Sequence, residues 1–190
     1  MTAVLEIRLD RGGSDGNPGN SDTLTNLRFK TADDNTQDTN NPIPIVSGQT
    51  KHSYWRHIYL HCTTAPTTKV DNLKFYTDGG GFGTGITLYA GDQFPTHNSG
   101  ASTGYELATG TPGDTGDELV ANHTGISAKS DAFGYTSGSP LSGPSISESG
   151  SIIDGIGDGS DYVMLQLTVG DTASPGTLSA ETLTIQYDEQ

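Results

Sequence analysis

Alternation of apolar and polar side chains near both ends of the chain limits its fold more than any other feature. In Ala3–Leu9 every second residue is apolar on one face, and Tyr162–Val169 and Ala180–Tyr187 repeat the pattern. A period of two places successive side chains on opposite faces of a β-strand. We therefore expect each of these segments to be a strand with one buried face.

Further strands are predicted between these ends, and sustained helical periodicity is absent from the sequence. One helical turn is predicted at Gly116–Ala121. About eight short strands with turn-rich connections favour an all-β fold, a β-sandwich or a jelly roll, as a single domain over residues 1–190. The other predicted strands are Asn26–Lys30, Ile43–Ser47 (short, or at a sheet edge, because of Pro42 and Pro44), His52–Thr63, Lys69–Thr77 and Ile86–Ala90.

Two glycine-rich segments are predicted to connect strands. Asp171–Gly176, which contains Ser-Pro-Gly, is expected to be the turn between the last two strands. Asp78–Gly85 lacks the G-K-[ST] of a phosphate loop and leads into a strand, so we expect it to join Lys69–Thr77 and Ile86–Ala90 as a hairpin connection that is either mobile or tightly turning.

The long segment Gly91–Ser160 is rich in glycine, serine and threonine, which make up 33 of its 70 residues. One interpretation is a surface excursion with weak hairpins of its own, anchored by Phe94, Tyr105, Phe133 and Tyr135. The other is a segment that is partly disordered until a partner binds. The spacing of the aromatic residues favours the first.

The charge of the chain is strongly acidic and unevenly distributed. The formal net charge is −14; residues 1–74 hold eight acidic and eight basic side chains, whereas residues 75–190 hold fifteen acidic residues and only Lys129. Such a surface repels phosphate backbones, so direct binding of DNA or RNA is not expected.

Cys62 is the only cysteine, so an internal disulfide is excluded. The N-terminal residues lack the pattern of an export signal, and no apolar run approaches the length of a membrane span. We expect folding in a reducing cytoplasm without a membrane anchor.

The aromatic segment within His52–Thr63 is predicted to be a central strand. Trp55, His57, Tyr59 and His61 share one face, and bulky side chains also occupy the other. Either the chain's own long loop or another protein is expected to cover the Trp55 face, and these four residues are candidates for an interface. Along a strand, His57 and His61 lie about 13 Å apart, so packing is favoured over a shared zinc ion.

Two loops are rich in oxygen ligands suited to calcium. Asp154, Asp158 and Asp161 stand on a glycine-rich backbone, and Asp10–Asp22 offers further carboxylates and amides. Neither loop matches the calcium-binding pattern of an EF-hand. Solvated turns are the favoured interpretation, with Asp154, Asp158 and Asp161 as the calcium candidates.

Motifs typical of enzymes are missing from the sequence. No G-x-S-x-G or H-E-x-x-H pattern occurs. Cys62 is expected to face the same way as Ile58 and Leu60, which makes it a poor nucleophile. We expect a non-enzymatic protein that requires no cofactor.

Three segments resemble small virion proteins of tailed bacteriophages: Tyr162–Glu189, Tyr54–His61 and the glycine-rich Asp78–Gly85. The resemblance implies a capsid decoration or cement protein, with a sandwich or jelly-roll core that clamps onto the shell. It implies as partners the major capsid protein and neighbouring copies of the chain itself, with assembly in the host cytoplasm.

The negative charge favours the outer surface of a shell over its DNA-lined interior. If the neutral part, residues 1–74, faces the shell, the acidic part faces water, unless the strands of the two parts interleave. The alternative is a carbohydrate-binding or adhesin-like module of a head or tail fibre.

Overall fold

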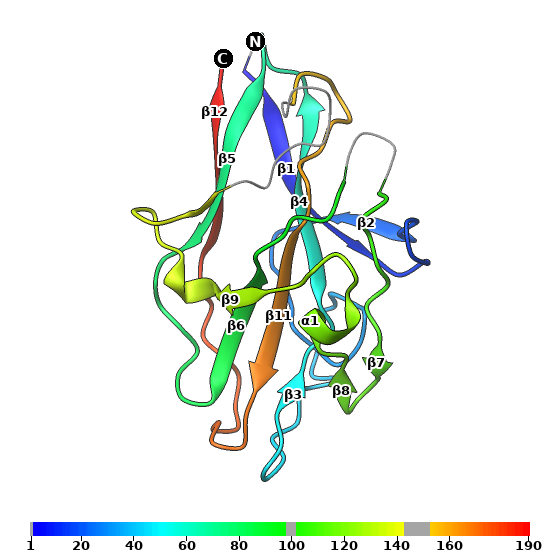
Figure 1. Ribbon diagram of the computed structural model, residues 1–190, viewed down its shortest axis with the longest axis vertical. Coiled ribbons are helices and arrows are strands. Elements are labelled where there is room, and N and C mark those ends of the chain that lie inside the picture. The colour runs from blue at the N-terminus through cyan, green and yellow to red at the C-terminus, as the bar shows by residue number, and fades with distance from the viewer. Residues whose placement is uncertain (1, 98–101, 143–152) are drawn as a thin grey trace.

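The computed structural model describes residues 2–97, 102–142 and 153–190, and these are built mainly from antiparallel strands (Figure 1). No helix in these ranges is long and apolar enough to cross a membrane. The elements are β1 Val4–Arg11, β2 Asn20–Thr23, β3 Lys51–His52, β4 Arg56–Thr64, β5 Val70–Thr77, β6 Ile86–Gly91, β7 Gly110–Thr111, β8 Thr115–Gly116, α1 Leu119–Asn122, β9 Lys129–Asp131, the 3₁₀ turn η1 Ala132–Gly134, β10 Leu141–Ser142, β11 Val163–Val169 and β12 Leu183–Glu189.

The larger sheet has the order β2-β1-β4-β11-β6-β9, with β3 paired to β11. β4 lies between β1 and β11, and Leu9 stands opposite Ile58, which in turn stands opposite Val163. These three side chains belong to one buried cluster. The predicted strands at both ends of the chain are thus confirmed, within one to three residues of the expected bounds.

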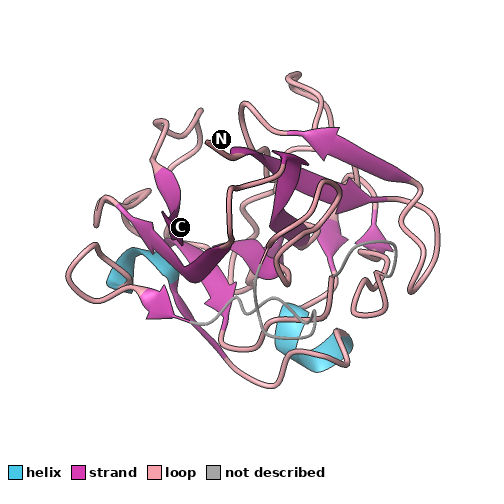
Figure 2. Cartoon of the chain, turned by 90° about the horizontal axis from the view of Figure 1, so that it is seen from above, coloured by secondary structure: helices cyan, strands magenta, loops and turns pink. Residues whose placement is uncertain are grey.

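The smaller sheet has the order β10-β5-β12 and packs on one face of the larger sheet. Phe75 of β5 and Leu141 of β10 are buried together with the strand residues named above, and Leu183 and Ile185 of β12 pack against them. The expected all-β sandwich is confirmed. Long loops surround the strands, and the two short helices lie at the periphery (Figure 2).

Part of the segment between β6 and β11 covers the other face of the larger sheet, while its strands β9 and β10 extend the larger and the smaller sheet. It contains the hairpin β7–β8, the predicted helical turn (α1, shifted by three residues at its start) and β9. Tyr105 is 1% exposed, and Phe94, Phe133 and Tyr135 are half-buried against the sandwich core. The described parts are thus anchored by these aromatic side chains and supply strands to both sheets; residues 98–101 and 143–152 lie outside the described residues.

Two predicted strands are absent from the described chain: Asn26–Lys30 and Ile43–Ser47 are irregular. The backbone of Arg28 explains the first case. Its N–H donates to the side chain of Asn35 (2.7 Å) and its carbonyl accepts from Arg56 (3.0 Å). Side chains take the backbone groups that a neighbouring strand would otherwise use.

The predicted hairpin at Asp78–Gly85 is wrong, whereas Asp171–Gly176 does lie in the connection between the last two strands but does not pair them. β5 and β12 belong to the smaller sheet, whereas β6 and β11 belong to the larger one. Asp78–Gly85 and Asp171–Gly176 therefore lie in connections that cross from one sheet to the other. Because β4 pairs with β11 and β5 with β12, strands of the neutral and acidic parts also interleave.

Candidate functional site

An apolar groove lies between the larger sheet and two irregular segments, 24–45 and 173–181, and it encloses about 1030 Å³. The smaller sheet covers only part of the larger sheet, and these segments cover the rest without filling the space. Ile45 at the rim is 37% exposed. We call this space the groove; its aliphatic and aromatic lining is Ile7, Leu24, Leu27, Phe29, Ile43, Ile45, Ile58, Phe82, Ile86, Leu88, Leu167, Val169, Leu178 and Leu183.

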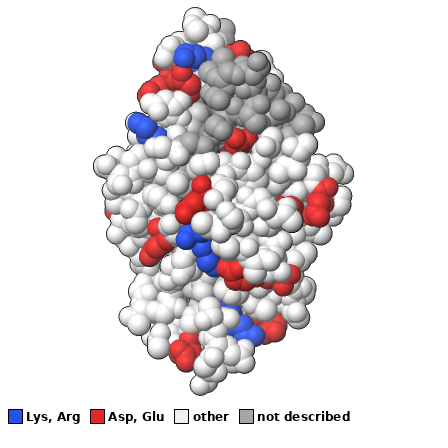
Figure 3. Space-filling model, in the orientation of Figure 1, with Lys and Arg blue, Asp and Glu red and all other residues white. Residues whose placement is uncertain are grey.

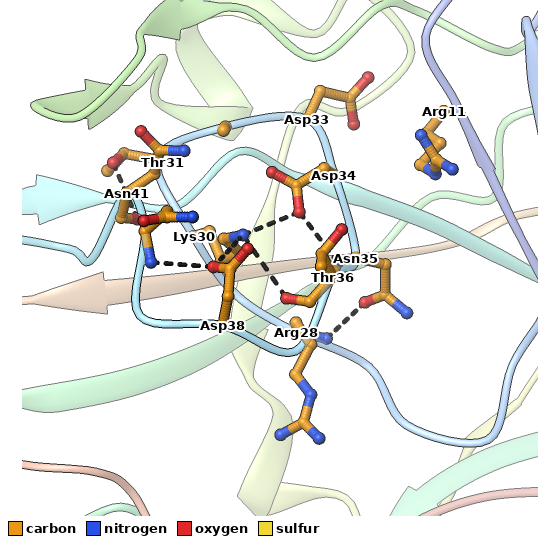
Figure 4. Close-up of polar contacts among 12 residues, drawn as sticks. Arg11, Arg28, Lys30, Thr31, Asp33, Asp34, Asn35, Thr36, Asp38 and Asn41 are labelled. Carbon is orange, nitrogen blue, oxygen red and sulfur yellow. Dashed lines mark hydrogen bonds and ion pairs between the residues drawn. The ribbon is translucent and has the colours of Figure 1, made fainter.

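A buried lysine organises the loop that forms one wall of the groove. Lys30 is 6% exposed, and its ammonium donates to Asp34 (2.8 Å) and Asp38 (2.9 Å), as Figure 4 shows. Burial by itself lowers the pKa of Lys30, but the hydrogen bonds to the two carboxylates outweigh it and raise that pKa. Charge-assisted hydrogen bonds from the Lys30 ammonium therefore stabilise the loop.

Arg56 of β4 fastens the same loop to the larger sheet. Its side chain is fully buried and donates to the Asp33 carboxylate (3.2 Å). It also donates to the carbonyl oxygens of Arg28 (3.0 Å), Ala32 (3.2 Å) and Asp34 (2.9 Å). One guanidinium thus satisfies backbone acceptors that the irregular loop leaves unpaired.

Arg28 lines the groove, and it is one of only two basic side chains without an ion pair in the described part of the chain. The other is Lys74. The remaining seven of the nine Lys and Arg residues pair with carboxylates. On the face shown in Figure 3, basic side chains mostly lie beside acidic ones. Figure 4 shows the Arg28 guanidinium turned away from the carboxylates around Lys30.

The predicted interface residues lie under the chain's own excursion. Trp55, His57 and Tyr59 are at most 3% exposed, and His61 is half-buried. The Trp55 indole donates to the carbonyl of Glu106 (3.2 Å). Two covers of the Trp55 face are expected from the sequence, the chain's own long loop or another protein. In the described residues the chain's own loop is the cover.

His57 and His123 form a buried neutral pair beneath this cover. Their Nε2 atoms are 3.2 Å apart, and the His57 Nε2 also accepts from the backbone N–H of Glu106 (3.3 Å). The His123 Nδ1 accepts from Gly125 (3.1 Å), which leaves its Nε2 as the donor to His57. Burial lowers the pKa of both imidazoles, and each ring packs against an aromatic neighbour, His57 against Tyr105 and His123 against Trp55.

A second, polar pocket of about 560 Å³ lies beside Asp10, Tyr59, His61 and His97. Tyr162 donates a hydrogen bond to Asp10, and His97 stacks on Tyr59 with ring centroids 3.8 Å apart. Burial raises the pKa of Asp10, and burial lowers that of His97 to about 4. At neutral pH His97 therefore carries no charge to pair with Asp10, whose carboxylate it approaches only to 3.9 Å.

The three calcium candidates do not gather at one point. Asp158 accepts from the backbone N–H groups of Asp154 (3.1 Å) and Gly155 (2.6 Å), and Asp161 accepts from His97 (3.2 Å). Within the described ranges, no three His, Cys, Asp or Glu side chains lie together as metal ligands would. The Asp154–Asp161 loop is stabilised by its own backbone hydrogen bonds.

In the other candidate loop, Asp10–Asp22, carboxylates likewise have partners within the protein. Asp15 accepts from Leu107 (2.9 Å), and Asp22 pairs with Arg11 (2.6 Å).

Cys62 is fully buried in β4, and burial raises the pKa of its thiol.

The groove and its polar wall were not found from the sequence. The sequence predicts strands at Asn26–Lys30 and Ile43–Ser47, and the groove depends on both segments being irregular. One signal was present: Lys30 is followed by Asp33, Asp34 and Asp38, a cluster of charge unusual for a strand. Comparison with protein-family models, curated proteins and solved structures gives no match.

Proposed function

We propose that the chain is a non-enzymatic structural protein of a phage virion that binds the outer surface of the shell and stabilises it. The observation that carries this proposal is the groove, which seats an apolar segment of the major capsid protein between the larger sheet and the irregular segments 24–45 and 173–181. A volume of about 1030 Å³ suits several aliphatic side chains of such a segment. Binding of that kind needs shape and apolar area rather than reactive groups.

The acidic exterior supports a position outside the shell. The net charge of −14 disfavours contact with packaged nucleic acid. Because the neutral and acidic strands interleave, we place the contact at the groove rather than at a face formed by residues 1–74.

Stabilisation follows from mass action. A protein that binds the assembled shell and not its separate subunits shifts the equilibrium toward assembly, and many copies on a symmetric lattice reinforce one another.

Heat release of DNA from particles tests the proposal. Particles that carry the wild-type protein should release DNA at a higher temperature than particles without it. Leu178→Trp, which fills the groove, should remove this difference. Ile156→Trp, at a position that is 71% exposed and outside the groove, should preserve it. Equal release temperatures with and without the wild-type protein would contradict the proposal.

The carbohydrate-binding alternative requires aromatic rings that are open to solvent. The large hydrophobic side chains exposed in the described parts of the chain are Val4, Ile45 and Ile156, all of them aliphatic. This observation does not favour a sugar platform.

A further inference from the structure

We propose that the segment seated in the groove carries a carboxylate among its aliphatic side chains and that this carboxylate pairs with Arg28. The inference rests on the proposed docking of a shell-protein segment and adds its chemistry. It specifies the charge that the bound segment carries and the residue of this chain that recognises that charge.

The charge pattern of the chain makes Arg28 exceptional. Carboxylates outnumber basic side chains by 23 to 9, yet the Arg28 guanidinium has no carboxylate partner among the described residues. Lys74 shares this property, but it does not line the groove. Arg28 is thus the one unpaired cation at the apolar site.

The acidic side chains that line the groove are already engaged. The Asp38 carboxylate accepts from Lys30 (2.9 Å) and from the backbone of Asn40 (2.8 Å). Glu181 turns its carboxylate toward the turn at Gly80. Neither side chain pairs with Arg28.

The backbone of Arg28 is fixed before a partner arrives. Its carbonyl accepts from Arg56 (3.0 Å) and its N–H donates to Asn35 (2.7 Å). Binding therefore has to order only the side chain, which reduces the entropy lost on association.

Filling the groove removes water from the half-buried guanidinium. A cation that is buried without a partner destabilises a complex strongly, whereas a bidentate carboxylate restores the lost hydrogen bonds. An uncharged aliphatic segment would leave Arg28 unpaired, and a cationic one would repel it. A carboxylate on an otherwise aliphatic segment matches both the apolar lining of the groove and the guanidinium of Arg28.

Calorimetric titration with two amphiphiles tests this chemistry. The probes are dodecanoate and dodecyltrimethylammonium, which share a twelve-carbon chain and differ in head-group charge, each kept below its micelle concentration. Wild-type protein should bind dodecanoate at least tenfold more tightly than dodecyltrimethylammonium. Arg28→Gln should weaken dodecanoate binding about tenfold, whereas Lys74→Gln, the matched loss of an unpaired cation outside the groove, should change it less than twofold.

The outcomes separate this inference from the proposed function. Absence of dodecanoate binding, equal binding of the two probes, or equal effects of Arg28→Gln and Lys74→Gln would each overturn the inference. If those results accompany wild-type stabilisation of shells, the proposed function stands without it. If the head-group preference holds but wild-type protein leaves shell stability unchanged, the shell-binding function fails and the carboxylate preference of the groove remains.

Discussion

At the scale of single residues, the wall of the groove depends most on Arg56. Replacing it with methionine leaves Oδ1 of Asp33 and three backbone carbonyls without the guanidinium donor. Removing one partner of a buried ion pair typically costs about 3–5 kcal/mol, so we expect a loss of that size in the free energy of unfolding. Urea denaturation measures it.

Arg8→Met is the matched control for that substitution. Arg8 pairs with Glu6 at 3.3 Å where both side chains are partly solvated, and surface pairs of this kind contribute at most about 1 kcal/mol. Losses for the two variants within about 1 kcal/mol of each other would show that Arg56 does not hold the loop.

Asp10 provides a pH-dependent prediction at the same scale. Burial raises its pKa in the folded state, so the folded chain retains the proton to higher pH than the unfolded chain does. The stability associated with this proton is present below the unfolded pKa and is lost as pH rises through the folded pKa. Asp10→Asn keeps an acceptor for Tyr162 and never ionises. Its stability relative to wild type should therefore increase from about pH 3.5 to pH 7.

Urea denaturation at several pH values measures this difference. Asp154→Asn, on an exposed loop, is the control and should follow the wild-type profile. Parallel profiles for Asp10→Asn and wild type would refute the assignment.

At the scale of elements, Tyr105 holds the excursion over the Trp55 face. Its hydroxyl donates to the carbonyl of Gly12 (2.8 Å), and its ring packs on His57 with centroids 4.6 Å apart. Tyr105→Ala removes a fully buried aromatic ring, a change that costs about 3–5 kcal/mol. We expect the cover to loosen and Trp55, the only tryptophan, to become accessible.

Trp55 fluorescence reports the result. Wild-type emission should be blue-shifted and resistant to acrylamide, and Tyr105→Ala should shift it to longer wavelength and make it quenchable. Tyr135→Ala, which loosens the excursion at a half-buried position on the other side of the larger sheet, should leave Trp55 emission unchanged. Quenching of wild-type Trp55 as strong as that of free tryptophan would contradict the buried assignment.

The sequence predicts elements better than it predicts their partners. The alternation in β1 and β12 gives the correct buried face because packing on one side of a sheet is a local property of a strand. In β11 both faces are buried, since Met164 and Gln166 are as inaccessible as Val163 and Leu165. The connections at Asp78–Gly85 and Asp171–Gly176 show the limit: turn residues end a strand but do not decide which sheet the next strand joins.

The groove lies beyond that limit for a related reason. Leu27 and Phe29 alternate as in a strand, yet Arg56, almost thirty residues away, binds the backbone between them. A long-range hydrogen bond of this kind leaves no periodic signal. The Trp55 face is predictable because His57, Tyr59 and His61 alternate along β4 and Trp55 lies directly before that strand.

At the scale of the whole molecule, strands of the neutral part (residues 1–74) interleave with strands of the acidic part (residues 75–190). This interleaving spreads the excess of carboxylates over both sheets. The net charge of −14 remains after all nine basic side chains are counted, and mutual repulsion of the excess carboxylates destabilises the folded state. Raising the salt concentration from about 10 to 200 mM shortens the screening length from about 30 Å to less than 10 Å. Screening also weakens the surface ion pairs, but each of these contributes little.

We therefore expect the urea midpoint at pH 7 to rise with salt. Near pH 4.4, the isoelectric point of the sequence, the repulsion vanishes and the rise should disappear. A midpoint that falls with salt at pH 7, or that rises equally at both pH values, would show that net charge does not limit the stability of this fold.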